Sequence, residues 1–461
     1  MIRSIRYSGD WSDAALLAEC LHRAGLGEAA ARRRAESFSR VAAALARDAP
    51  RAEPWHGLVV PGRIEVLGKH TDYAGGRTMV VAAEQGFALL VRPRTDPRVR
   101  VIDAGWGQEV AFALDAELVP RRGHWSNYPM TVARRLARNF ALPLVGADIA
   151  VASDLPPAAG MSSSSALVVA IFLALAEVNR LADRPEFRAS IRSLTDLAGY
   201  LATVENGQTF GTLPGDRGVG TFGGSEDHTA ILCAQPGHLS QYRYCPVRLE
   251  QLIPMPKEHV FAVAVSGVVA EKTGAAMERY NAASRRVGQI VQAWRAATGR
   301  NDVYLADILA QGLQARSQLE SILRGSAYPD ASAEALLARL HHFLIENEEL
   351  QPAAADALRR GDLAEFGRVV DASQEAAERL LGNQVPETVV LARTARQLGA
   401  AAASAFGAGF GGGVWALVHR DHLKPFVRAW GDAYLSQFPQ HAQRAAFLVT
   451  EAGPPAFRLT P

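Results

Sequence analysis

The chain has 461 residues, of which 48% are hydrophobic and 21% charged. This is the composition of a globular protein with room for two domains, and it excludes disorder, collagen and coiled coil. The 49 Lys and Arg nearly balance the 47 Asp and Glu, for a net charge of +2. Because no long basic run occurs, we expect no nucleic-acid and no membrane partner, and a small molecule as ligand.

The three cysteines are too few for a disulfide framework or a Cys-rich metal site. Arg3, Arg6 and Asp10 interrupt any apolar core of a secretion signal. Residues 155–176 and 399–418 are uncharged and of membrane length, but the first stretch opens with two prolines and the second is rich in glycine. We therefore expect a cytoplasmic protein.

Hydrophobic periodicity predicts the elements of the first half in chain order. One or two amphipathic helices cover residues 13–48. Strands follow at 56–61, 62–67, 79–83, 88–92, 99–102 and 147–152, with a helix at 129–139 after the fifth of them. Helices at 166–179 and 186–204 and strands at 230–233 and 239–244 complete this β-rich half.

The segment 250–258 contains two prolines and is the candidate domain boundary. It predicts an N-terminal domain of residues 1–256, with residues 1–50 as a helical extension, and a C-terminal domain of residues 257–461. A strand at 260–267 and helices at 278–297, 304–323, 332–346 and 375–381 make the second half rich in helix. A repeat of the solenoid or propeller kind does not occur.

A first small-residue cluster, residues 155–166, directly precedes an apolar helix. Backbone N–H groups at such a helix N-terminus can face an anion, and serine hydroxyls can add donors or hold a cation. The cluster lacks the Gly-Lys-Ser/Thr ending of a P-loop and the spaced glycines of a dinucleotide fingerprint. Since Ser is a preferred N-cap residue, an ordinary helix cap gives the same pattern.

A second cluster, residues 61–76, places Arg63, Lys69, His70, Thr71 and Asp72 at one strand-to-loop turn. Donors and acceptors in consecutive positions suit a polyhydroxylated ligand. A solvated turn, with Asp72 serving the turn geometry, is the structural alternative.

A third cluster, residues 406–413, is a glycine loop that enters an apolar strand. Glycine there permits a close approach of the backbone to a ligand. A crossing of two strands without any ligand gives the same pattern. Two carboxylates complete the set: Glu205 follows a helical run, and Asp227 follows a glycine-rich loop. Carboxylates so placed can hold Mg²⁺ and act as a base.

These loops, in this order and spacing, resemble those of the GHMP kinase superfamily. Gly62-Arg63 through Leu67-Gly68, followed by His70-Thr71-Asp72-Tyr73 and Gly75-Gly76, is similar to the galactokinase signature. The resemblance covers residues 55–418. It implies an α/β (α+β) fold of two domains, one ribosomal-protein-S5-like and one ferredoxin-like, with the active site in the cleft between them. The activity it implies is ATP- and Mg²⁺-dependent phosphorylation of the anomeric hydroxyl of galactose.

Site residues follow from the resemblance one at a time. Asp227 matches the catalytic aspartate that accepts the hydroxyl proton, and Arg63 matches the arginine beside it. Ser164 and Glu205 match the Mg²⁺ ligands. His70, Asp72, Gly224 and Tyr280 match sugar contacts, and Lys69 and Thr71 lie beside them in the signature. The nucleotide contacts are expected at Trp125, Tyr128, Ala158, Ala159, Gly160, Met161, Ser162, Ser163 and Ser164. We expect a monomer or a weak homodimer.

Three features depart from the family pattern. Lys69 stands where galactokinases usually carry glutamate near the sugar C6 hydroxyl, and this reversed charge suggests a uronic acid or another anionic sugar. Alternatively, Lys69 points to solvent or pairs with an acid such as Glu226, and galactose remains acceptable. Ala158 replaces a usual glycine. The segment 205–227 is longer than usual by about ten residues and is either a lid or a tolerated surface loop.

Other functions stay open at this point. A related kinase of galacturonate, arabinose or a heptose shares the motifs, and so does a catalytically silent sugar and ATP sensor. Retention of Arg63, Ser164, Glu205 and Asp227 favours the enzyme. A dehydrogenase is excluded because no glycine fingerprint of dinucleotide binding joins a strand to a helix in this chain. A zinc hydrolase is excluded because His341-His342 has no ligand spacing around it.

Overall fold

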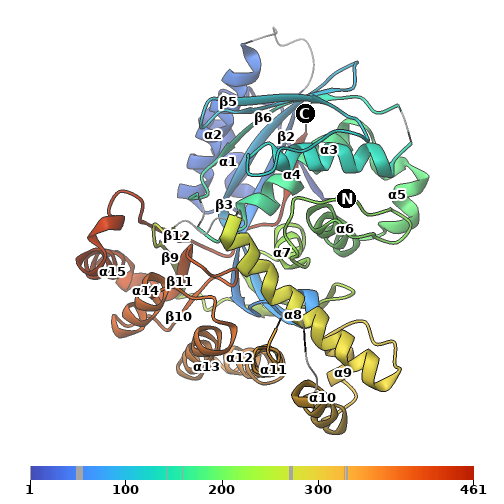
Figure 1. Cartoon of the computed structure of the whole chain (residues 1–461). Helices are drawn as coiled ribbons and strands as arrows, with labels where there is room; N and C mark the ends of the chain where they lie inside the picture. Colours follow the sequence, from blue (N-terminus) through green and yellow to red (C-terminus); the bar gives the residue numbers. More distant parts are fainter. Residues whose placement is uncertain are drawn as a thin grey trace.

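The computed structural model describes residues 2–47, 55–141, 143–157, 159–268, 274–325, 328 and 331–460. Two sheets organise these residues (Figure 1). The larger has the strand order β1-β13-β2-β3-β6-β4-β5, with β7 paired to β3 and β8 paired to β7. Its strands are β1 (Arg3–Arg6), β2 (His56–Leu67), β3 (Arg77–Pro93), β4 (Arg98–Asp103), β5 (Gln108–Ala113), β6 (Ala147–Ser153), β7 (His238–Arg243), β8 (Arg248–Pro254) and β13 (Phe457–Thr460).

The smaller sheet has the order β10-β11-β9-β12. Its strands are β9 (His259–Val265), β10 (Ala402–Ala405), β11 (Gly413–His419) and β12 (Ala446–Thr450). The chain passes from the larger to the smaller sheet between β8 and β9. This is where Pro254 and Pro256 indicate a domain boundary in the sequence. The predicted division at residue 257 needs one correction, because β13 returns to pair with β1 and β2 of the larger sheet.

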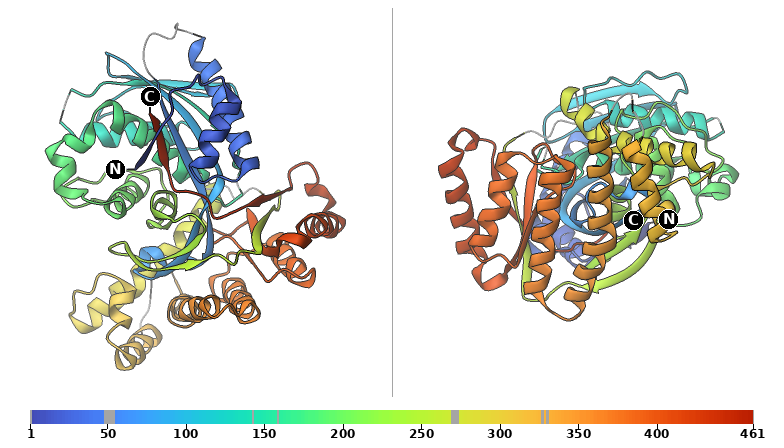
Figure 2. Two further views of the ribbon diagram at one scale, coloured as in Figure 1. Left: turned by 180° about the vertical axis from the view of Figure 1, so that it is seen from behind. Right: turned by 60° about the horizontal axis from the view of Figure 1, so that its bottom comes forward.

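Alternating residues bury both faces of the larger sheet, as the two-residue period of a strand requires. Val59 and Leu90 face a cluster formed with α1 (Ala14–Arg23) and α2 (Glu28–Ala46). Val60 and Leu89 face the opposite core with α3 (Asn127–Asn139), α4 (Ser163–Val178) and α6 (Leu194–Asn206). Seen from behind, α1 and α2 cover one face and the C-terminal strand lies in the sheet (Figure 2).

Most of the second half is helical. It contains α8 (Gly274–Thr298), α9 (Leu305–Leu309), α10 (Leu313–Gly325), α11 (Ala333–Leu344), α12 (Gln351–Arg359), α13 (Leu363–Ala376), α14 (Pro386–Gln397) and α15 (Leu423–Gln437). Two π-helical turns, Ile345–Leu350 and Ala377–Leu381, extend α11 and α13. Gly312, with φ of +98°, separates α9 from α10, so the helix expected over 304–323 is two helices.

Two further expectations from the sequence are wrong in detail. The helix expected over 186–204 is divided into α5 (Pro185–Ser190) and α6. Residues 230–233, expected as a strand, end the helix α7 (Glu226–Cys233). A short apolar run has no period that distinguishes a strand from a buried helix, and burial of Ile231 and Leu232 is common to both.

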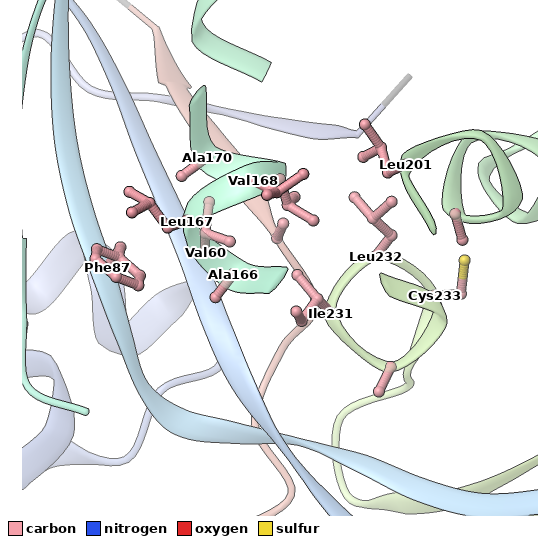
Figure 3. Close-up of a cluster of buried hydrophobic side chains, with 14 of the residues drawn as sticks. Val60, Phe87, Ala166, Leu167, Val168, Ala170, Leu201, Ile231, Leu232 and Cys233 are labelled. Carbon is pink, nitrogen blue, oxygen red and sulfur yellow. The ribbon is translucent and has the colours of Figure 1, made fainter. Parts of the chain in front are cut away.

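A shared core fixes the elements that carry the predicted site. Figure 3 shows Val60 of β2 beside Ala166, Leu167 and Val168 of α4, with Ile231 of α7 close to them. All are nearly or fully buried. The strand that holds Arg63 and the two helices that begin near Ser163 and Asp227 are therefore packed against one another. Within the described ranges, no helix has both the length and the apolar character needed to cross a bilayer.

Candidate active site

Arg63 joins two of the predicted motifs. Its Nε donates to Asp227 Oδ1 at 2.8 Å, and its Nη1 donates to the Gly160 carbonyl oxygen at 2.7 Å. Burial alone would lower the Arg63 pKa, but the carboxylates of Asp227 and Glu226 raise it above its ordinary value. The guanidinium is therefore charged. It connects the carboxylate of Asp227 to the glycine-serine loop, by which we mean residues 159–165 of the first small-residue cluster.

Asp227 lies in the first turn of α7, where a helix dipole favours negative charge. Ser165, near the start of α4, donates to its Oδ2 at 3.1 Å. With Arg63 on Oδ1, both carboxylate oxygens are held in place. The side chain remains 19% exposed, so it can reach a ligand.

The signature turn folds back on itself after β2. The Thr71 hydroxyl donates to the Gly68 and Arg77 carbonyl oxygens at 2.8 and 2.6 Å, and so closes the turn. Asp72 Oδ2 accepts the Glu226 N–H at 3.0 Å. Burial raises the Asp72 pKa, although backbone donors oppose this. A Cβ on Gly224 would lie 2.4 Å from Asp72 Oδ2, so only glycine allows this approach.

His70 and Tyr280 form an aromatic wall beside this turn. Their ring centroids are 5.1 Å apart. His70 Nδ1 is 2.8 Å from the Tyr73 hydroxyl. Arg339 of α11 donates a hydrogen bond to the His70 carbonyl oxygen. Tyr280 comes from α8, so the wall is built from both halves of the chain.

The phosphate-loop residues expected from sequence surround the start of α4. Gly160 and Ser162 have φ of 79° and 58°, a conformation that turns the chain sharply before the helix begins at Ser163. The third glycine loop packs directly on this turn, because a Cβ on Gly413 would lie 2.8 Å from the Ala159 carbonyl oxygen. Met161 accepts a backbone bond from Arg63. Ala158 lies outside the described residues.

The expected Mg²⁺ ligands lie near each other around Tyr128. Burial and the Glu205 carboxylate together raise the Tyr128 pKa to about 12, although a hydrogen bond with Ser164 opposes the increase. Glu205 Oε1 is buried and accepts no hydrogen bond from the described residues. One carboxylate and one hydroxyl, without a complete protein cage, fit Mg²⁺, which keeps waters and substrate phosphates as its other ligands. Trp125 is partly buried beside His124, with ring centroids 6.0 Å apart.

One pocket is lined by seven of the predicted site residues. Of the predicted residues, it brings together those of the catalytic pair, the sugar contacts and one metal ligand. They are Arg63, His70, Asp72, Glu205, Gly224, Asp227 and Tyr280. The pocket is also lined by Glu65, Tyr73, Thr221, Gly223, Glu226, Gly407 and Ala408.

Lys69 and Thr71 lie elsewhere. Lys69 is 1% exposed, and its Nζ donates to Ser373 Oγ at 3.0 Å and to Ser404 Oγ at 2.9 Å. It faces neither the pocket, nor solvent, nor Glu226, so the expectation of a direct sugar contact does not fit its position. Thr71 is fully buried and its hydroxyl serves the turn.

Sequence reasoning missed Glu65 and Ser165 and treated Glu226 only as a partner for Lys69. Glu65 had a usable signal, since it follows Arg63 by two positions on one strand and so shares its face. Ser165 is the last of four consecutive serines. Nothing in the serine run distinguishes the one that reaches Asp227.

The long segment between Glu205 and Asp227 is anchored at several points. Asp216 pairs with Arg134 of α3, and Asn281 of α8 donates to the Gly220 carbonyl oxygen at 3.0 Å. The Val219 carbonyl oxygen accepts from Asn127 at 3.1 Å. The segment is a fixed wall of the pocket between α3 and α8 in this structure.

Comparison with known proteins agrees with this geometry. Residues 127–211 match the model of the GHMP kinases N terminal domain, and residues 354–436 match that of the GHMP kinases C terminal domain. Residues 49–93 match the galactokinase galactose-binding signature.

Curated relatives and a solved structure extend the match. A galactokinase of Chloroflexus aurantiacus is 32% identical over 385 residues, which cover 81% of this chain and 86% of the relative. A galactokinase of Roseiflexus sp. is 29% identical, with the same coverage. The fold is similar to that of Lactococcus lactis galactokinase complexed with galactose, at a TM-score of 0.72, 23% identity, and coverage of 91% and 97%. The two-domain fold and the resemblance seen in the sequence are thus confirmed, and the chain belongs to the galactokinase family of the GHMP kinases.

Proposed function

We propose that this protein transfers the γ-phosphoryl group of ATP to the anomeric hydroxyl of galactose. The observation that carries the proposal is the Arg63–Asp227 pair in the pocket, with 2.8 Å between Nε and Oδ1. Phosphoryl transfer needs a positioned oxygen nucleophile, a group to take its proton, and positive charge near the phosphate oxygens. Asp227 serves as the base, and Arg63 supplies the charge and favours the ionised carboxylate.

Nucleotide binding is assigned to the glycine-serine loop and the N-terminus of α4. The N–H groups at the N-terminus of a helix this long face anionic groups favourably. Ser164 and Glu205 would hold Mg²⁺, which neutralises charge on the β- and γ-phosphates when bound. Tyr128 interacts with both side chains and would help to hold them in place.

The pocket supports a neutral sugar. Besides Asp227 and Glu205, three carboxyl side chains line it, namely Glu65, Asp72 and Glu226. Among its described lining residues, Arg63 alone has a permanently cationic side chain. Lys69, which suggested an anionic sugar, is bonded to two serines away from the pocket. A uronate would therefore meet like charge without a free cation.

Galactose is favoured over arabinose or a heptose by the match to the galactose-binding signature and by the names of the relatives. An enzyme is favoured over a silent sensor because Ser165 and Arg63 both orient Asp227. A sensor has no need of a base held on both carboxylate oxygens.

The test is ADP release from Mg-ATP with galactose, arabinose, galacturonate and glucose in parallel. We expect galactose to give the highest kcat/KM and galacturonate no turnover above the ATP-only background. Preference for galacturonate would contradict the charge argument. ATP binding without turnover on any of these sugars would support the sensor.

We further infer a cytoplasmic protein that is a monomer or a weak homodimer. The inferred location rests on the low cysteine content of the sequence. Light scattering over a range of protein concentrations tests the oligomeric state.

A further inference from the structure

Two acidic side chains in the pocket have no part in the proposed chemistry. Glu65 and Glu226 are 4% and 5% exposed, and both line the pocket. Oε1 of each accepts no hydrogen bond from an N–H or hydroxyl donor of the described residues. The two carboxyl groups flank the same guanidinium, that of Arg63, and each shifts the pKa of the other. Two buried carboxyl groups this close can hydrogen-bond to each other only when they retain one proton.

Both groups crowd the guanidinium of Arg63. Glu226 Oε1 is 3.2 Å from Arg63 Nε, and Glu65 Oε2 is 3.8 Å from Nη2. The same Nε–H already donates to Asp227 at 2.8 Å. One N–H cannot point at two acceptors equally well, so a fully charged Glu226 would compete with Asp227 for Arg63.

The pair cannot move away on the side of the third glycine loop. A Cβ on Gly407 would lie 2.2 and 2.3 Å from the two carboxylate oxygens of Glu65. Glycine at this position allows the loop to touch the carboxyl directly. Glu65 therefore cannot move towards Gly407, and a change in its charge is the simplest way to relieve the crowding around Arg63.

We propose that Glu65 and Glu226 are positioning residues that share one proton and thereby leave Arg63 bonded to Asp227. The inference rests on the proposed function, in which Asp227 takes the proton of the sugar hydroxyl. With the shared proton, the pair carries one negative charge. Without it, the pair carries two, and Arg63 is drawn from Asp227 towards Glu226.

The surroundings favour the shared proton. Burial and the neighbouring Glu65 raise the Glu226 pKa well above its ordinary value, and burial raises that of Glu65. The charged and titratable groups that face the pair come from every element packed on it. Arg63 and Lys69 favour ionisation, whereas Asp72, Asp227, Glu346 and Tyr244 add negative charge or the potential for it.

The first test is the pH dependence of kcat for galactose in wild type, E65Q and E226Q. Glutamine is neutral at every pH, so neither variant allows the second negative charge. We expect wild-type kcat to fall on the alkaline side by at least about tenfold, which corresponds to about 1.4 kcal/mol. E226Q should lose this fall, and its kcat at neutral pH should drop by less than about a hundredfold. E109Q, at an exposed residue paired with Arg100, is the matched control and should follow wild type.

Three results would overturn the proposal. They are an alkaline fall that persists in folded E226Q, a wild type with no such fall, and a loss above a hundredfold in E226Q at neutral pH. The last result would mean that an ionised Glu226 is needed. Thermal melts of each variant establish that the comparison is made between folded proteins.

Infrared difference spectroscopy reads the shared proton without turnover. Wild type should show a carboxylic acid C=O band at neutral pH that both E65Q and E226Q weaken. An enzyme that phosphorylates galactose but has no such band overturns this inference alone. A protein that has the band but no galactose turnover supports the shared proton and refutes the proposed function.

Discussion

Replacing Lys69 by methionine tests whether this lysine belongs to the fold or to the sugar site. The Lys69 ammonium is buried between Ser373 and Ser404. Ser373 in turn donates to both oxygens of Glu346, at 3.0 and 2.8 Å, and Glu346 is fully buried. Methionine keeps the volume of the chain but removes the charge that compensates Glu346. The variant therefore leaves a buried carboxylate without its cation.

The size of the effect follows from this arrangement. Removing one partner of a buried charge pair costs about 3–5 kcal/mol. Glu346 keeps the hydroxyl of Ser373 and the Gly68 N–H, which donates at 2.7 Å. These remaining donors place the expected loss of unfolding free energy at the lower end, about 3 kcal/mol.

Urea denaturation, followed by both tryptophan fluorescence and circular dichroism, measures this loss. Coincident transitions in the two signals show two-state unfolding, so that the free energies of the variants can be compared. K69M/E346Q should recover most of the stability, because neither position 69 nor position 346 then carries a charge. K424M, at an exposed lysine of α15, is the control. A loss below about 1 kcal/mol in K69M, together with a changed preference between galactose and galacturonate, would refute the reasoning and return Lys69 to the sugar site.

Four further predictions follow from the site. D227N should lower kcat by about 10²–10⁴-fold and leave ATP affinity unchanged in equilibrium titration; equal loss of ATP binding would indicate a wrong assignment. E205Q should raise the Mg²⁺ concentration for half-maximal activity about tenfold or more, since a charged contact is worth about 1.5–3 kcal/mol. G224A should raise KM for galactose but not for ATP, because the new Cβ meets Asp72 Oδ2 at 2.4 Å. D72N should melt at a higher temperature than wild type at neutral pH. Burial raises the Asp72 pKa, so the neutral carboxyl group stabilises the fold, and this stability is lost as pH rises through the raised pKa. The difference in melting temperature should therefore vanish below about pH 4, in melts recorded across the pH range.

Part of the site could be predicted from sequence because several of its residues fall in short segments with a recognisable pattern. Arg63, His70 and Asp72 share one turn, and the order of the loops identified the family and with it Asp227. The side-chain partners could not be predicted in the same way. Lys69 is bonded to residues 304 and 335 positions away, and no local pattern encodes such contacts. The charge reversal at Lys69 therefore suggested a substrate, whereas in the structure it belongs to the packing between the signature turn and the helices of the second half.

The fold shows the same division between local and distant information. The helices α2, α4 and α8 and the buried strands β2, β3 and β6 of the larger sheet have clear periods, and their existence was predicted, whereas that of α14 and α15 was not. The pairing of β13 with β1 joins the two ends of the chain, and neither four-residue strand has enough sequence to indicate a partner. The four apolar residues 230–233 fit either a strand or a helix, and the acidic first turn that indicates the helix α7 lies before them.

Phosphorus NMR of the product formed from Mg-ATP and galactose tests the central claim most directly. The account predicts one new resonance with wild type, that of galactose phosphorylated at the anomeric oxygen, and a signal at least about a hundredfold weaker with D227N after the same reaction time. Phosphate at another hydroxyl, or an undiminished signal with folded D227N, would contradict it.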